Sequence, residues 1–444
     1  MGCTVSSLGP LDGTVTVPGD LRLTLMLMSF GTCFGSPLTI TAPSGAQEVA
    51  WLGGFLKSGG AEVAFSDDVI TVSGECLQGD VTIGTDISDR VLHIVTGLAV
   101  FSAQSVRIVD GATGRARLVE PLLELLALLG VKQDSVSQDG DDVLISRAEC
   151  APSDVVQIRS QWAFEVSLAA SLSSRCPVTI SFSPGIMPLS ERVLGKLGFV
   201  LNDPDTTGDY NTELERRIAK ASGDRPPDVK RLEWSGTPVE TFPVPGDTTV
   251  AAAVAACAAI IQRSEVTVKG VLWEPGRRGF FDALRRMKVR ISHDVKRSGH
   301  MCDTADVHIG WSALEGVHLT TDRAETMTSE LLILAATASS ARGETVVSDT
   351  INPPVIGREA FKILARGLEN CGVHIGDFTE GIVLRGGGEL RGNAVDAEGL
   401  PATACALALA GVTVSGETTI SNCDEDVYPL VDFLKIVRNI SRSI

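Results

Sequence analysis

Six segments of the chain repeat one pattern of apolar and polar positions. Each opens with a turn or cap residue such as Gly, Asp, Ser or Thr, continues as a helix that is apolar on nearly every side, and ends in a β-branched strand. A helix without a polar face must be buried on every side. We therefore predict six buried helices, each followed by a strand, in Gly19–Ile40, Asp86–Val109, Ile158–Ile180, Gly246–Val268, Glu325–Val347 and Gly399–Ile420.

A second kind of helix alternates with the first and is amphipathic. One follows each of the first five buried segments, ends at a Gly or another helix breaker, and leads into a short strand; the sixth segment is followed by the helix Asp426–Ile440. Each repeat reads as strand, buried helix, strand, outer helix and strand, with right-handed crossovers expected for the parallel pairings. This order predicts an α/β fold.

The repeats fall into two groups of three. Three lie before or around a polar insertion, Asn202–Lys230, and three lie after it. A chain of 444 residues also exceeds the usual size of a single hydrophobic core. We therefore predict two domains of three repeats, with a boundary near residues 235 to 245.

Charge and hydropathy narrow the partners and the surroundings of the protein. The 38 Lys and Arg against 55 Asp and Glu give a net charge of −17, which argues against nucleic acid or an anionic membrane as a partner. No apolar run reaches the ~20 residues of a membrane span, and the amino terminus lacks a secretory signal pattern. We expect a soluble, cytoplasmic protein.

The cysteines, histidines and Gly-rich segments suggest no metal and no cofactor. Ten cysteines stand singly without a CxxC pair, and several lie in apolar helices, which favours buried reduced thiols over disulfides or a metal site. The six histidines show no HxH or HExxH spacing. Two Gly-rich segments, 276–281 and 384–392, resemble phosphate loops but lack the Lys-Ser/Thr pair, so we interpret them as turns.

The repeated turns carry a resemblance to a known family. Val-Pro-Gly-Asp occurs at 17–20 and at 244–247, each time before a buried helix, and the last buried helix lies in DAEGLPATACALALAG. With the sixfold order, these segments make the whole chain similar to the enolpyruvyl transferases, and most of all to the 5-enolpyruvylshikimate-3-phosphate synthases. The resemblance implies two domains, each an inside-out α/β barrel of three βαβαββ repeats, that close on phosphoenolpyruvate and a phosphorylated sugar or cyclitol.

The family also places the amino-terminal strand in the second domain. On that basis we predict a first domain of residues 16–240 and a second of residues 1–15 with 241–444. The partners implied are small molecules, phosphoenolpyruvate and a hydroxyl acceptor, and we expect a monomer.

The resemblance further indicates which residues would form the site. In the family a substrate hydroxyl adds to the enol carbon of phosphoenolpyruvate and phosphate then leaves, which needs Lys and Arg around the anions and carboxylates as acid and base. Matching the family's motifs one position at a time gives five candidate substrate ligands and one candidate catalytic residue. They are Arg22, Arg90, Arg117, Ser160 and Gln161 for substrate binding, and Glu330 for catalysis.

Several of these residues also have a structural interpretation. Arg90 and Arg117 could be held by nearby carboxylates such as Glu120. Glu330 follows Ser329, which stands where the family has its catalytic Asp, and could be a carboxylate that interacts with the dipole of its own helix. Both interpretations remain open at the level of the sequence.

Many charged positions of the family hold other residues in this chain. The Lys and Arg of the first buried helix correspond to Leu21 and Met26, and Asp20 adds a negative charge at the same turn. In the second domain, the Lys-Glu-Ser/Thr-Asp-Arg motif corresponds to Ile356–Ala360, and the Gly-Asp-His-Arg turn to Gly399–Ala402. Each lost charged hydrogen bond forfeits about 1.5 to 3 kcal/mol.

Two functions therefore stay open. The chain is either a diverged enolpyruvyl (carboxyvinyl) transferase that uses an acceptor other than 3-phosphoshikimate, or a catalytically inactive homologue that binds a metabolite or a protein in a regulatory or structural role. The retained arginines of the first domain favour the transferase, and the replaced residues of the second domain favour the inactive homologue.

Overall fold

The computed structural model describes residues 2–84, 88–109, 116–140, 142–152, 155–158, 160–182, 186–187, 189–203, 228–236, 238–298, 301–319, 326–348, 357–378, 381–388 and 390–442. The predicted polar insertion at 202–230 lies mostly outside the described residues. By its internal contacts the chain divides into two units. We call Leu21–Val244 the N-unit, and Met1–Asp20 together with Pro245–Ile444 the C-unit.

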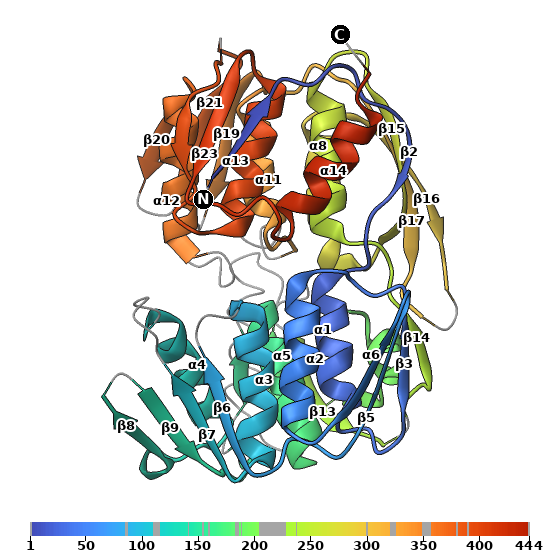
Figure 1. Ribbon diagram of the computed structural model, residues 1–444, viewed down its shortest axis with the longest axis vertical. Coiled ribbons are helices and arrows are strands. Elements are labelled where there is room, and N and C mark those ends of the chain that lie inside the picture. Colours follow the sequence, from blue (N-terminus) through green and yellow to red (C-terminus); the bar gives the residue numbers. More distant parts are fainter. Residues whose placement is uncertain are drawn as a thin grey trace. The chain divides into compact units, whose positions relative to one another are not determined.

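Three buried helices form the centre of the N-unit. α1 (Leu21–Gly31), α3 (Asp89–Ser102) and α5 (Gln161–Ser174) pack against one another and lie side by side in Figure 1. The outer helices are α2 (Gln47–Ser58), α4 (Ala116–Leu128) and α6 (Glu191–Lys196). The three sheets of this unit are, in order of hydrogen-bonded neighbours, β14 (Thr241–Pro243), β3 (Leu38–Thr41), β5 (Val69–Ser73) and β4 (Glu62–Ser66); β6 (Asp80–Gly84), β7 (Ser105–Val109), β9 (Asp142–Ser146) and β8 (Val136–Asp139); and β10 (Val156–Ile158), β11 (Val178–Phe182), β13 (Asp228–Trp234) and β12 (Phe199–Asn202).

The C-unit repeats this arrangement. Its buried helices α8 (Thr248–Ile260), α11 (Glu330–Ala338) and α13 (Pro401–Thr413) pack against one another. The outer helices are α9 (Gly279–Arg286), α12 (Gly357–Asn370) and α14 (Leu430–Ile440). The sheets are β16 (Arg290–Lys296), β17 (Thr304–Gly310), β15 (Glu265–Leu272) and β2 (Asp12–Thr16); β18 (His318–Leu319), β19 (Gly343–Ser348), β21 (Gly381–Gly386) and β20 (His374–Phe378); and β1 (Gly2–Ser6), β23 (Glu417–Ser421) and β22 (Ala394–Asp396).

Each of the six sheets described contains one parallel pair of strands and antiparallel pairings beside it. In four sheets a buried helix connects the two parallel strands, as α3 connects β6 to β7. In the other two the first strands are exchanged: β2 precedes α1 but pairs with β15, and β14 precedes α8 but pairs with β3. The chain therefore passes between the units twice, once at each Val-Pro-Gly-Asp turn.

Small side chains allow the buried helices to lie close together. In α8 every residue from Val250 to Ala259 is buried, and seven of these ten are Ala. In α3, a Cβ on Gly97 would lie only 3.1 Å from Val166 Cγ1 of α5. Such close contact between apolar helices leaves no room for a polar face. The predicted α/β fold with six buried helices is confirmed.

The prediction that all ten cysteines are reduced is wrong for two of them. Cys33 and Cys76 form a disulfide, and the other eight are free. Cys33 follows the end of α1, and the loop after β5 brings Cys76 back to it across 43 positions of sequence. Such a pairing depends on tertiary structure, so the sequence spacing gave no sign of it. Across the described residues, the model contains no helix with both the length and the apolar character of a membrane span.

Candidate functional site

The two Val-Pro-Gly-Asp turns lie against each other in the C-unit. Gly19 and Gly246 form an antiparallel bridge, and each aspartate donates its backbone N–H to the other turn, Asp20 to Pro245 O at 2.8 Å and Asp247 to Pro18 O at 2.8 Å. The repeated sequence motif is therefore a reciprocal pair of turns. It fixes the first residues of α8 and holds two carboxylates near each other.

The two aspartates of these turns have different contacts. Asp247 caps α8, since its Oδ1 accepts from Val250 N at 2.9 Å, and it also accepts from the hydroxyl of Tyr428 at 2.9 and 3.1 Å. Asp20 is fully buried, and its Oδ2 accepts from Arg277 Nη2 at 2.8 Å. Arg277 is itself only 5% exposed, so this is an ion pair inside the protein.

Glu330 belongs to the same cluster. Its Oε1 accepts from the hydroxyls of Thr248 and Thr249 at 2.9 and 2.8 Å, and its Oε2 accepts from the backbone N–H and the hydroxyl of Thr328 at 2.6 and 2.7 Å. Arg277 Nη2 also donates to Thr248 Oγ1 at 2.7 Å, which links the guanidinium to the carboxylate. We call the set Asp20, Asp247, Arg277, Glu330 and Tyr428 the buried ion cluster.

The electrostatics of the cluster keep its charges in place. Burial alone would raise the pKa of Glu330, but the Arg277 guanidinium and the hydroxyls of Thr328 and Thr249 outweigh it and lower this pKa from 4.5 to about 2. Burial alone would lower the pKa of Arg277, but the carboxylates of Asp20, Glu330 and Asp247 raise it. At neutral pH, Glu330 is therefore an anion with both oxygens hydrogen-bonded.

A second polar cluster lies in the N-unit, where α1 and α5 begin. Arg22 is 7% exposed; its Nε pairs with Glu165 Oε1, and its Nη1 donates to Gln161 Oε1 at 2.6 Å. Ser160 is buried and caps α5 by accepting from Ala163 N at 3.1 Å. Three of the candidate substrate ligands, Arg22, Ser160 and Gln161, therefore come together at one end of the unit.

The neighbouring helix α3 reaches the same end. Its His93 stacks on Trp162 of α5, with ring centroids 4.4 Å apart, and Arg90 lies one turn before His93 and is partly exposed. At the other end of α5, Arg175 donates to the carbonyl of Cys33, just beyond α1. The starts of α1 and α5 thus lie together, as do their ends, so the two helices run parallel. The positive ends of helix dipoles favour anions, which makes this end of the N-unit suited to a negatively charged group.

The remaining candidates are less fully described. Arg117 lies in the first turn of α4, and its side chain is outside the described residues, as are Arg115 and Arg159. Ile356 also lies outside them. In the described part of the chain, no group of three or more His, Cys, Asp or Glu side chains could hold a metal ion.

Two residues of these clusters escaped the sequence reasoning. Arg277 stands in the Gly-rich segment 276–281, which we interpreted as a turn, yet it is the cation of the buried ion cluster. Glu165 is the one acidic residue of the apolar segment 158–180. A single charge in an otherwise apolar helix needs a buried partner, and this signal could have identified it.

Comparisons with known proteins agree with one another. The family model described as EPSP synthase (3-phosphoshikimate 1-carboxyvinyltransferase) matches residues 231–429, almost all of them in the C-unit. The chain is 26% identical over 425 residues to a 3-phosphoshikimate 1-carboxyvinyltransferase of Synechococcus sp. (strain WH7803), covering 94% of this chain and 93% of the relative. It is 27% identical to the protein of the same name from Herpetosiphon aurantiacus, covering 95% of each.

Solved structures show the same fold. EPSP synthase from Acinetobacter baumannii superposes with a TM-score of 0.73 at 19% identity, over 99% of this chain and 98% of the other. The enolpyruvyl transferase NikO from Streptomyces tendae gives a TM-score of 0.69 at 16% identity, over 98% and 96%. By sequence and by fold, the chain is an EPSP synthase-like member of the enolpyruvyl transferase family.

Proposed function

We propose that this protein transfers an enolpyruvyl group from phosphoenolpyruvate to a hydroxyl of an acceptor other than 3-phosphoshikimate, one that carries fewer negative charges. The relatives are named for transfer of a carboxyvinyl group to 3-phosphoshikimate. The observation that supports a different acceptor is the pairing of both buried arginines with internal carboxylates, Arg22 with Glu165 and Arg277 with Asp20.

The energetics of these pairs oppose a highly charged substrate. A phosphate that took over Arg277 would leave the buried carboxylate of Asp20 unpaired, and breaking a buried ion pair costs about 3 to 5 kcal/mol. The same holds for Arg22 and Glu165. Cations without such partners are therefore the better anchors for phosphoenolpyruvate, and this role falls to Arg90 and Arg117 in the proposal.

The proposed reaction conserves atoms and charge. The acceptor oxygen bonds to the enol carbon of phosphoenolpyruvate while the methylene carbon takes a proton; phosphate then leaves as that proton is lost again. In the N-unit, Ser160, Gln161 and Arg22 would orient the acceptor. Glu330 would act as a base, because a carboxylate with a pKa of about 2 does not carry a proton to give at neutral pH.

The contacts of Glu330 also support a second candidate, a catalytically inactive homologue that binds a metabolite or a protein. Each carboxylate oxygen already accepts two hydrogen bonds from Thr248, Thr249 and Thr328. To act as a base, Glu330 would have to break one of them. A role in holding α8 and α11 together accounts for the same contacts without catalysis.

Phosphate release decides between these candidates. The full chain is incubated with phosphoenolpyruvate and a panel of acceptors, including shikimate, 3-phosphoshikimate, nucleosides and amino sugars. We expect release with a weakly charged acceptor, loss of release in Arg117→Ala, and no change in Arg107→Ala, a control on an exposed arginine of the same unit that pairs with Asp139 and Asp142. Release with no acceptor in the panel, and no thermal shift by phosphoenolpyruvate, would favour the inactive homologue.

Complementation tests the choice of acceptor separately. The chain is expressed in a bacterial strain that lacks its own 3-phosphoshikimate 1-carboxyvinyltransferase, on medium without aromatic amino acids. We expect no growth. Growth would show that 3-phosphoshikimate is an acceptor after all and would refute this part of the proposal.

A further inference from the structure

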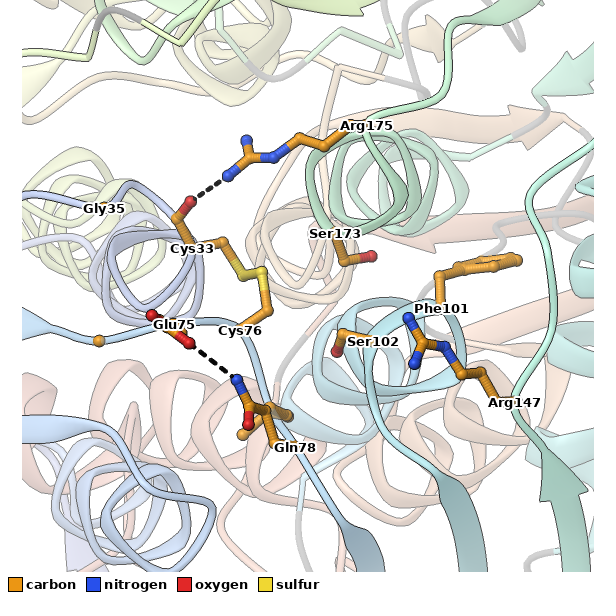
Figure 2. A pocket seen from close by; sticks show the side chains of 12 residues that line it. Cys33, Gly35, Glu75, Cys76, Gln78, Phe101, Ser102, Arg147, Ser173 and Arg175 are labelled. Atoms are coloured by element: carbon orange, nitrogen blue, oxygen red, sulfur yellow. Dashed lines mark hydrogen bonds between the residues drawn. A yellow bond between two sulfur atoms is a disulfide. The ribbon is translucent and has the colours of Figure 1, made fainter.

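A pocket of about 310 Å³ lies in the N-unit at the end opposite to Arg22 and Gln161. Figure 2 shows its lining, which comes from the ends of all three buried helices: Cys33 after α1, Phe101 and Ser102 from α3, and Ser173 from α5. Its volume suits a small metabolite. Because it lies at the other end of these helices, it is separate from the proposed substrate site.

The disulfide between Cys33 and Cys76 forms part of the wall of this pocket (Figure 2). The two sulfur-bearing residues differ in exposure: Cys33 is 2% exposed, whereas Cys76 is partly exposed. A thiol that enters the pocket therefore meets Cys76 first. Attack on Cys76 would make Cys33 the leaving group.

The surroundings of Cys33 suit a leaving thiolate. Arg175 donates its Nη2–H to the carbonyl of Cys33 at 2.6 Å, and its guanidinium carbon lies 3.4 Å from the ring centroid of Trp234. The stacking holds the positive charge beside Cys33. The hydroxyl of Thr32 lies 3.6 Å from Cys33 Sγ and can donate to a thiolate there. A nearby cation and a hydrogen-bond donor lower the pKa of a leaving thiol, and a thiol of lower pKa leaves faster.

The charges at the pocket favour a ligand with carboxylates. Arg147 and Arg175 bring two positive charges, and within the described part of the chain neither shows a carboxylate at ion-pair distance. The one acidic residue of the lining, Glu75, accepts from the amide of Gln78 at 3.0 Å. Arg147 is exposed, and its backbone N–H donates to Gln104 O at 3.0 Å, which anchors it at this end of the unit.

We propose that this pocket is a thiol-exchange site that takes small, carboxylate-bearing thiols and forms a mixed disulfide with them at Cys76. The ligand thiolate bonds to Cys76 Sγ, the Cys33–Cys76 bond breaks, and its electron pair leaves on Cys33 Sγ, which takes up a proton. The ligand sulfur is oxidised and Cys33 is reduced. Arg147 binds the carboxylate of the ligand, and Arg175 stabilises the departing thiolate.

The full chain, purified without reductant, tests this with glutathione as the probe. Timed samples are quenched in acid and analysed by intact mass and peptide mapping. We expect one adduct with the whole mass of one glutathione, because exchange loses no atom, located at Cys76 together with a new free thiol at Cys33. An adduct at Cys33, no adduct, or alkylation of both cysteines before any thiol is added would overturn the proposal.

Two further thiols and matched variants separate the roles of the arginines. The rates with glutathione, neutral 2-mercaptoethanol and cationic cysteamine are each divided by the rate of the same thiol with a small model disulfide. We expect glutathione to be fastest and cysteamine slowest. Arg147→Gln should slow glutathione alone by about threefold, the size of an exposed charge pair, while Arg231→Gln, a control on an exposed arginine of the same unit, should not.

Arg175 should behave differently from Arg147. Arg175→Gln is expected to slow all three thiols alike, and Arg175→Lys, which keeps the charge, should restore most of the rate. Thermal melting of each variant checks that it is folded. Equal normalised rates for the three thiols, or an Arg147→Gln variant that reacts with glutathione as the wild type does, would refute recognition by charge.

Discussion

Replacing Glu330 by Gln removes one charge from the buried ion cluster and changes almost no volume. The amide oxygen can still accept from Thr248 and Thr249. The amide nitrogen, however, would face the backbone N–H of Thr328, which now donates to the carboxylate at 2.6 Å, so donor would meet donor. Arg277 would keep Asp20 but lose the second anion that raises its pKa. The substitution therefore isolates the contribution of the carboxylate charge.

The shifted pKa sets the size of the effect. The fall of the Glu330 pKa from 4.5 to about 2 corresponds to about 3 kcal/mol of stability at neutral pH. Since the folded-state pKa is the lower one, this contribution is present above pH 4.5 and is lost as the pH falls toward 2. At pH 3, about 2 kcal/mol of it should be gone. Glu330→Gln should thus cost about 3 kcal/mol at pH 7 and about 1 kcal/mol at pH 3.

Urea unfolding of wild type and variant at both pH values measures this difference. In a thermal scan at pH 7, about 3 kcal/mol corresponds to a melting temperature lower by about 6 to 12 °C for a unit of this size. The control is Glu359→Gln, an exposed carboxylate of α12, which should change stability by less than about 0.5 kcal/mol. A Glu330→Gln cost that is equal at pH 7 and pH 3, or that is as small as the control, would refute the reasoning.

Two further substitutions test the helix contacts of the N-unit. Glu165→Gln removes the internal anion that pairs with Arg22, so titration calorimetry should find tighter binding of phosphoenolpyruvate; unchanged or weaker binding would mean that Arg22 does not reach the ligand. Gly97→Val adds a branched side chain 3.1 Å from Val166 Cγ1 and should lower the free energy of unfolding by about 1 to 3 kcal/mol. Its control is Gly54→Ala on the exposed face of α2, where nothing lies within 4 Å and helix propensity should add up to about 1 kcal/mol; similar losses in both would refute close packing as the cause.

The architecture could be predicted because it rests on local patterns. A helix such as α8, with Ala or another apolar residue at every position from Val250 to Ala259, has only one stable environment, a fully buried one. The strands on either side follow from β-branched residues and turns. Six repeats of the same pattern then allow few arrangements.

The site could be predicted only in part, because its contacts join distant positions. Asp20 and Arg277 are 257 residues apart, and Arg22 and Glu165 are 143 apart. Each of these residues is visible in the sequence, but its partner is decided by which helix ends meet. The disulfide of Cys33 escaped prediction for the same reason.

The two aspartates of the Val-Pro-Gly-Asp turns show how one motif supports different roles. Asp247 precedes a helix of its own unit and caps it, while Asp20 precedes the point where the chain passes into the N-unit. The strand exchange at the paired turns therefore leaves the Asp20 carboxylate in the C-unit, where it binds Arg277. An anion that competed for this arginine would have to displace a carboxylate that is covalently fixed at the site, and no concentration of substrate dilutes such a competitor. For this reason, the energetics of the buried ion cluster favour an acceptor with few charges over a doubly anionic phosphate ester.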